Sequence, residues 1–157
     1  MKLFIVRHGE SPFDAETDHQ RSLSLKGKMQ AKKTAVFIAS LLPTNLTKII
    51  ASDARRTAET ARIIKQNLPQ VDLITDRRYY DARVGDWCDT IVQQYNIVQL
   101  ILVGHNPTVS LLAQHLGAGR NLHFTPACVA YFDLEIKPDG LKLPAIFNAF
   151  YSPDANQ

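Results

Sequence analysis

The sequence predicts a single α/β domain, a three-layer α/β/α sandwich with a mostly parallel central sheet and a C-terminal antiparallel hairpin. Strand-like and helix-like segments alternate along most of the 157 residues, an order that favours parallel strands joined by helices on both faces of a sheet. Two further strand-like segments, 127–136 and 141–150, flank Pro138-Asp139-Gly140, a turn sequence typical of a hairpin. Neither a linker nor a repeat divides the chain, so residues 1–157 are expected to form one domain.

The first strand and helix come from the N-terminal part of the chain. Residues 3–6 are apolar and predict a buried strand, and the polar segment 10–23 is long enough to predict a functional loop. Ser24 is expected to cap a helix that continues to about Leu42, because small and apolar residues recur near one of its faces. Pro43 is expected to end this helix.

The middle of the chain predicts a second strand, a second helix and a weaker strand. Residues 48–51 form the apolar second strand. The next helix has apolar residues at helical spacing and is expected to be capped by Ser52 or Asp53. Residues 71–75 predict the weaker strand, and the stretch 77–87 is expected to be irregular.

A central strand and its helix follow. Residues 88–95 predict a short helix, and 98–103 form the most apolar strand, which favours a central position covered on both faces. Pro107 fits the first turn of a helix that reaches Leu116, and Gly117 is expected to stop it.

The composition excludes several classes of protein. It is ordinary for a globular chain, with 45% apolar and 21% charged residues, and the formal charge of +3 is too small to indicate a nucleic-acid or anionic-membrane partner. We see no leader and no membrane-spanning stretch, and Cys88 and Cys128 form no metal-binding pattern. We therefore expect a cytoplasmic, monomeric protein with reduced thiols, no metal and no cofactor.

The strand at 3–6 runs directly into Arg7-His8-Gly9, which is the first sign of a reactive site. In open α/β sheets, ligands bind at the C-terminal ends of the strands. A neutral imidazole there is a good nucleophile, and an adjacent guanidinium can hold a phosphate. Gly9 is expected to let the backbone approach the same anion. The alternative is a buried strand whose last residues carry no chemistry.

The strand at 98–103 ends in the same way, in Gly104-His105-Asn106. If the two strands are neighbours in a parallel sheet, His8 and His105 lie at the same edge. A lone histidine in such a position is usually satisfied by the backbone, whereas two at matching strand ends favour a shared site.

Arginines at two other positions supply further positive charge. The segment Ser52–Thr60 opens a helix, and a helix N-terminus attracts anions. An arginine in or near its first turn would add a bidentate clamp, whereas Arg55 is predicted to pair on the surface with Glu59 or Asp53. Arg21 lies in the loop after His8 and either folds over the same pocket or remains solvated.

In this order and spacing, the motifs resemble the histidine phosphatase superfamily (phosphoglycerate mutase-like) over nearly the whole chain. The resemblance is greatest to its short, SixA-type phosphohistidine phosphatase branch. The matching elements are Arg7-His8-Gly9, the Ser-x-x-x-Arg-x-x-x-Thr pattern of Ser52–Thr60, Gly104-His105-Asn106-Pro107, and the branch-specific Asp18-x-x-Arg21-x-Leu23-Ser24-x-x-Gly27. The resemblance implies that His8 is the phosphorylated nucleophile and His105 a second catalytic residue. It implies that the phosphate is bound by Arg7, Arg21 and Arg56.

The chain departs from the superfamily pattern at two places. Ser22 stands where the family often has proline, and 76–82 contains no glutamate where larger members carry a general acid. Asp81 or Asp86 could substitute for that acid. The small branch generally lacks it, and Tyr80-x-Ala82 is similar to the local pattern of that branch.

The missing acid favours a substrate with a weakly basic leaving group. An alkoxide needs a proton from a dedicated acid, whereas an imidazole leaves with little help. The resemblance therefore implies a metal-independent phosphatase that hydrolyses phosphohistidine on a phosphotransfer or signalling protein through a covalent intermediate. His105 is expected to be protonated and to donate to the phosphate. The alternatives are a phosphatase of a small phosphomonoester and a non-catalytic domain that binds phosphate- or sulfate-like anions.

Overall fold

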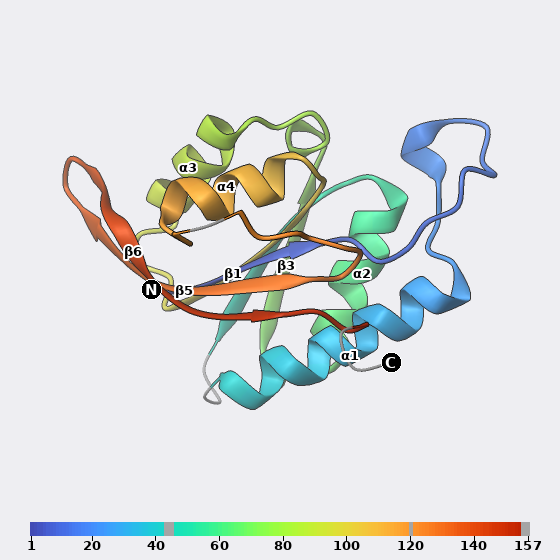
Figure 1. The fold of residues 1–157 in the computed structure, drawn as a ribbon, viewed down its shortest axis with the longest axis horizontal. Helices are drawn as coiled ribbons and strands as arrows, with labels where there is room; N and C mark the ends of the chain where they lie inside the picture. Colours follow the sequence, from blue (N-terminus) through green and yellow to red (C-terminus); the bar gives the residue numbers. More distant parts are fainter. Residues whose placement is uncertain (43–45, 120, 155–157) are drawn as a thin grey trace.

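A six-stranded sheet forms the centre of the protein, with its strands in the order β3-β2-β4-β1-β5-β6 (Figure 1). The computed structural model describes residues 1–42, 46–119 and 121–154. Neighbouring strands are parallel from β3 to β1, and β5 and β6 add as an antiparallel hairpin. The strand bounds are β1 Lys2–Arg7, β2 Thr47–Ser52, β3 Val71–Asp76, β4 Gln99–Gly104, β5 Val129–Lys137 and β6 Gly140–Tyr151.

Helices cover both faces of the sheet, so the predicted three-layer α/β/α fold is confirmed. The helix bounds are α1 Leu25–Leu41, α2 Arg55–Gln66, α3 Val84–Gln93 and α4 Thr108–Leu116, with short 3₁₀ turns η1 Asp18–Gln20 and η2 Arg77–Tyr79. Apolar residues of α1 and α2 pack with one face of the sheet, and those of α3 and α4 pack with the other (Figure 1). None of the described helices is both long and apolar enough to cross a bilayer.

The order of the strands brings the reactive strand ends together. β4 lies between β1 and β2 and is parallel to both, with Arg7 opposite Gly104 and Ala51 opposite Val103. All six residues of β4 are buried, as expected for a central strand. The segments that follow β1, β2 and β4 therefore meet at one edge of the sheet.

Several expected element ends are confirmed and others are wrong. Ser24 caps α1, since its hydroxyl accepts a hydrogen bond from Gly27 N at 3.0 Å. Neither Ser52 nor Asp53 caps α2, because Ser52 is still the last residue of β2 and the chain turns into the helix at Ala54. Pro43, expected to end α1, lies outside the described residues.

Helix α3 begins at Val84, four residues before the predicted start, within a stretch expected to be irregular. The cause is a local cap, in which Asp86 Oδ2 accepts a hydrogen bond from Arg83 N at 2.8 Å. Trp87 in its first turn is 1% exposed and stacks on Tyr79 with ring centroids 4.4 Å apart. The apolar ring anchors the helix at a point where the sequence shows no periodicity.

Candidate active site

His8 follows β1 and is held by backbone on both sides. Its N–H donates to Gly104 O at 3.3 Å, and its carbonyl accepts from Ala127 N at 2.9 Å. Its side chain forms a hydrogen bond between Nδ1 and Gly9 O at 2.7 Å. Because a carbonyl oxygen only accepts, Nδ1 must carry the proton, and Nε2 keeps its lone pair. The ring is therefore held in the tautomer that a nucleophile at Nε2 requires.

His8 is neutral at physiological pH. Burial, with smaller contributions from the nearby His105, Arg56 and Arg7, lowers the pKa of its imidazole to about 3 against the opposing effect of the Gly9 hydrogen bond. The residue is 8% exposed, so the neutral ring is shielded from water. A neutral and buried imidazole is an available nucleophile over a wide pH range.

His105 follows β4, and its ring centroid lies 5.5 Å from that of His8. Nε2 lies 2.9 Å from Ser52 Oγ, and Nδ1 lies 3.4 Å from Arg56 Nη2. Since a guanidinium only donates, Nδ1 accepts and Nε2–H donates to the serine.

Burial, followed by the positive charge of Arg56, lowers the pKa of His105 to about 4. The expectation of a protonated His105 concerned the site with phosphate bound and stays a prediction. A phosphate bound beside the ring would bring negative charge and favour the protonated form.

Arg56 is the arginine of α2 that faces the histidines, as the family motif implied. It is 6% exposed, and its guanidinium donates from Nη1 to Asp18 O at 2.7 Å and from Nη2 to Asp18 Oδ2 at 3.0 Å. Arg55 points away and pairs with Glu59, with Nε 3.1 Å from Oε1. The predicted surface role of Arg55 is confirmed.

Arg7 and Arg56 both have a buried donor without a partner. Arg7 Nη1 donates to Phe124 O at 2.8 Å. The Nε atoms of Arg7 and Arg56 are buried and have no hydrogen-bond partner among the described residues. Leaving such a donor unsatisfied costs about 1–3 kcal/mol, so an anion that accepts from both would be bound favourably.

Arg21 lies close to the site and is linked to Arg56 by the carboxylate of Asp18. Its guanidinium donates to Pro12 O at 3.0 Å, to Ser11 O at 2.7 Å and to Asp18 Oδ1 at 2.8 Å. It contacts neither histidine directly by hydrogen bond, but its charge contributes to the lowered pKa of His105. Arg21 thus borders the pocket through Asp18, which it shares with Arg56.

Asp18 and Tyr80 are site residues to which sequence reasoning assigned no role. The Tyr80 hydroxyl donates a short hydrogen bond to Asp18 Oδ2, and this bond, together with those from Arg21 and Arg56, keeps the pKa of the Asp18 carboxyl well below its usual range. The Tyr80 ring meets His105 edge to face at 5.6 Å. The position of Asp18 three residues before Arg21 was a usable signal for their ion pair, and the Tyr80-x-Ala82 pattern singled out Tyr80 without giving it a role.

Gly9 has a different role from the one expected. A Cβ added to Gly9 would lie 2.5 Å from Gly27 O, and one added to Gly27 would lie 2.1 Å from Glu10 O. The two glycines therefore allow the segment after β1 to pack directly on the first turn of α1. This close packing fixes the backbone beside His8, whereas the expectation was space for an anion.

The two aspartates considered as general acids have other surroundings. Asp86 caps α3 through Arg83 N, and both Asp81 and Asp86 are exposed. In the described part of the chain, no three His, Cys, Asp or Glu side chains are grouped so that they could hold a metal ion. Positive charge in the pocket comes from arginine.

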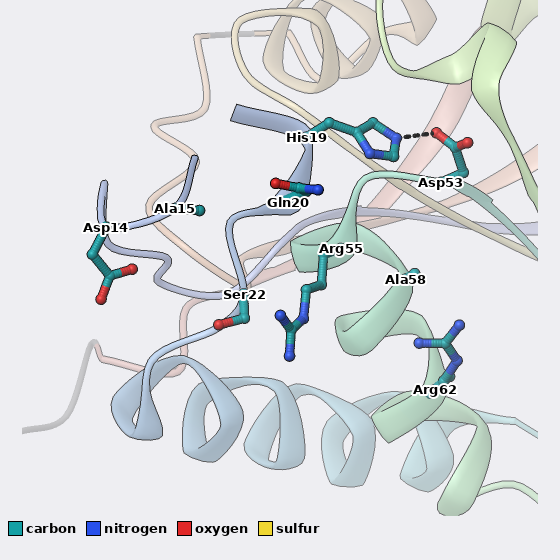
Figure 2. A pocket seen from close by; sticks show the side chains of 9 residues that line it. All are labelled: Asp14, Ala15, His19, Gln20, Ser22, Asp53, Arg55, Ala58 and Arg62. Atoms are coloured by element: carbon teal, nitrogen blue, oxygen red, sulfur yellow. Dashed lines mark hydrogen bonds and ion pairs between the residues drawn. The ribbon is translucent and has the colours of Figure 1, made fainter. Parts of the chain in front are cut away.

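A cavity of about 560 Å³ lies between the loop that follows β1, which contributes His19, and the start of α2 (Figure 2). His19 and Asp53 form one of its walls, with His19 Nε2 2.7 Å from Asp53 Oδ1. The His19 ring also meets the Tyr80 ring edge to face at 5.0 Å. This cavity is therefore separated from His105 by only two aromatic rings.

Sequence comparison places this geometry among known proteins. A family model described as "Histidine phosphatase superfamily (branch 1)" matches residues 3–90. "Probable phosphoglycerate mutase GpmB" of Enterobacter sp. (strain 638) is 37% identical over 89 residues, 54% of this chain and 40% of that protein. "Phosphoglycerate mutase-like protein 4" of Arabidopsis thaliana is 28% identical over 97 residues, 59% of this chain and 41% of that protein. The chain spans about two fifths of the length of these curated relatives.

Solved structures match the fold over its whole length. A SixA structure from Agrobacterium tumefaciens superposes with a TM-score of 0.81 at 22% identity, covering 97% of each chain. The protein histidine phosphatase SixA complexed with tungstate gives a TM-score of 0.82 at 21% identity, covering 98% of this chain and 97% of that one. These similarities establish that the chain has the fold of these SixA structures.

Proposed function

Because the chain belongs to the histidine phosphatase superfamily, we propose that it is a phosphatase that hydrolyses phosphohistidine on a protein through a phosphorylated His8. The observation that carries the proposal is the state of His8. Its Nδ1–H is bound to Gly9 O and its lone pair is at Nε2, beside two arginines with unsatisfied buried donors. The site combines a nucleophile with receptors for an anion.

The reaction proceeds in two displacements at phosphorus. His8 Nε2 attacks in line, the Nε2–P bond forms, and the P–N bond of the substrate breaks with its electron pair passing to the leaving ring nitrogen. A substrate ring that is protonated on its other nitrogen leaves as neutral imidazole. Water then attacks the phosphorus of His8, and the Nε2–P bond breaks with its electron pair returning to Nε2. The products are neutral His8 and dihydrogen phosphate, which carries both protons of the water.

Positive charge stabilises both displacements. Arg7 and Arg56 lie close enough for their charges to lower the pKa of His8, and each has a buried Nε without a partner among the described residues. Arg21 becomes available when it exchanges Asp18 for a phosphate oxygen. Preorganised donors of this kind are the main source of rate enhancement in phosphoryl transfer. His105, neutral in the unliganded site, becomes a donor to the phosphate once the bound dianion has raised its pKa.

The surroundings of the pocket support a phosphoramidate over an alkyl phosphate. Asp86 is engaged at the start of α3 and Asp81 is exposed, so neither is placed beside His8 as a proton donor. An imidazole leaving group tolerates that arrangement, whereas an alkoxide does not. The similarity to SixA structures supports the same substrate class.

A small phosphomonoester is the second candidate substrate, because the curated relatives include proteins named as phosphoglycerate mutases. The deciding experiment compares turnover of a histidine-phosphorylated phosphotransfer domain with turnover of a panel of sugar phosphates, with and without a chelator. We expect turnover of the phosphoprotein, unaffected by chelator. Efficient hydrolysis of a sugar phosphate and none of the phosphoprotein would replace this proposal with the second.

A further inference from the structure

A groove between α1 and α2 combines apolar and basic side chains on an exposed surface. It has a volume of about 290 Å³ and is lined by Leu25, Lys28, Met29, Lys32, Glu59, Arg62 and Ile63. Leu25 is 77% exposed and Met29 is 56% exposed. They are four residues apart on α1 and therefore lie on one face of that helix. Large apolar side chains this exposed and this close together indicate a surface for binding.

The groove continues to the active site. Arg62 of α2 lines both the groove and the cavity of Figure 2, which Arg55 of the same helix also lines. The far wall of that cavity is His19, which meets Tyr80, and Tyr80 in turn meets His105. A molecule lying along α1 and α2 would thus reach the edge of the phosphate pocket.

The groove has unmatched positive charge. Its carboxylate, Glu59, is already paired with Arg55. Lys28, Lys32 and Arg62 form no ion pair with a carboxylate in the described part of the chain. Such a surface attracts an acidic partner and speeds its encounter.

We propose that this groove docks an acidic amphipathic helix of the protein that carries the phosphohistidine, an inference that rests on the proposed function. An amphipathic helix fits because it places apolar side chains against Leu25, Met29 and Ile63 while its acidic flanks meet the two lysines and Arg62. With a volume of about 290 Å³, the groove takes a few side chains from one face of such a helix, whose backbone stays on the surface. The docked helix brings the phosphohistidine of its own protein to His8.

The test compares one groove variant with one matched control on two substrates. The groove variant is Lys28→Glu/Lys32→Glu, and the control is Lys65→Glu/Lys137→Glu, which makes the same charge change at exposed positions outside the groove. The substrates are an acidic, histidine-phosphorylated phosphotransfer domain and free phosphohistidine. All four altered side chains are exposed lysines, and circular dichroism establishes that both variants are folded.

We expect the groove variant to lose at least tenfold in kcat/KM on the phosphorylated domain, mainly through KM, and to stay within twofold of the parent on free phosphohistidine. The control should stay within twofold on both. Leu25→Ser/Met29→Ser should reproduce the loss without any change of charge. A rise in salt concentration should lower kcat/KM of the parent on the domain but not of the groove variant.

The outcomes separate the docking site from the proposed function. If the parent hydrolyses both substrates and the groove variant behaves like the control, the docking site is wrong and the proposed function is retained. A parent that hydrolyses free phosphohistidine but not the domain also overturns it. Parent inactivity on both substrates overturns the proposed function itself. Cosedimentation of the parent with phosphatidylglycerol vesicles, lost in the groove variant while kinetics on the domain are unchanged, would assign the surface to a membrane instead.

Discussion

Replacing Arg56 with lysine tests the assignment of this residue to the phosphate. Arg56 is buried, its Nη atoms donate to Asp18, and its Nε has no partner. Lysine keeps the charge but replaces the planar fork with a single ammonium group. At least one donor to the transferring phosphoryl group is lost, and removal of one such donor costs about 2.7–4 kcal/mol of barrier, a factor of about 10²–10³ in kcat.

The neighbouring arginine is the control. Arg55 has a side chain that is 63% exposed and pairs with Glu59 on the surface. Arg55→Lys changes the same residue type, one position away on the same helix, and such exposed pairs contribute only about 0.2–1 kcal/mol to stability. We expect Arg55→Lys to stay within twofold of the parent in kcat on free phosphohistidine.

The assay is single-turnover release of phosphate from free phosphohistidine, with thermal unfolding of each variant measured in parallel. The reasoning requires that Arg56→Lys unfolds as a cooperative, folded protein while its kcat falls about a hundredfold or more. A loss of less than about fivefold in a folded Arg56→Lys variant would refute the assignment of Arg56 to the transferring phosphate. An equal loss in Arg55→Lys would show that the effect is not specific to Arg56 and comes from a general disturbance at the start of α2.

Three further predictions follow from the site. His8→Ala should abolish turnover and the acid-labile phosphoenzyme, and labelled phosphate found on His105 in an active His8→Ala variant would contradict it. Asp81→Asn and Asp86→Asn should each leave kcat/KM for phosphohistidine within about tenfold of the parent, or roughly 1.4 kcal/mol, and a hundredfold loss in either would identify a general acid. The free energy of unfolding should fall as the pH drops from 7 to 5. In the folded protein the pKa values of His8 and His105 are about 3 and about 4, whereas both imidazoles titrate near 6.5 in the unfolded chain. The unfolded chain therefore binds up to two more protons than the folded protein in this range. The free energy of unfolding should change by at most about 2.7 kcal/mol per pH unit. If urea unfolding shows that this free energy rises as the pH drops from 7 to 5, the prediction is wrong.

The elements of the fold were predictable where a local pattern specifies them. Residues 3–6 and 100–103 are continuous apolar runs, and both lie within strands of the structure. The start of α3 was not predictable from periodicity, because Trp87 is buried by packing on Tyr79 and the helix is started by Asp86. The apolar periodicity of this segment indicates neither the stacking of Trp87 on Tyr79 nor the cap formed by Asp86.

The protonation of His105 shows the same limit within the site. The sequence placed this residue correctly at the end of the strand next to that of His8. It did not reveal that burial and Arg56 would lower its pKa, because those effects depend on how deep the ring lies and which charge faces it. In the structure His105 is a neutral ring whose Nε2–H donates to Ser52, and its protonation beside a bound phosphate stays a prediction.

By itself, the sequence determined the α/β fold, the strand ends that carry His8 and His105, and the choice of Arg56 over Arg55. The fold and the two strand ends follow from periodicity and from the residues at the ends of apolar runs, whereas the choice of Arg56 rests on the resemblance to the histidine phosphatase motif. Only the tertiary structure decided that Asp18 joins Arg21 and Arg56, and that Tyr80, which is 62 residues away in the chain, donates to the same carboxylate. Such contacts depend on the order of the strands and the path of the loops around them, which no segment of the sequence specifies alone.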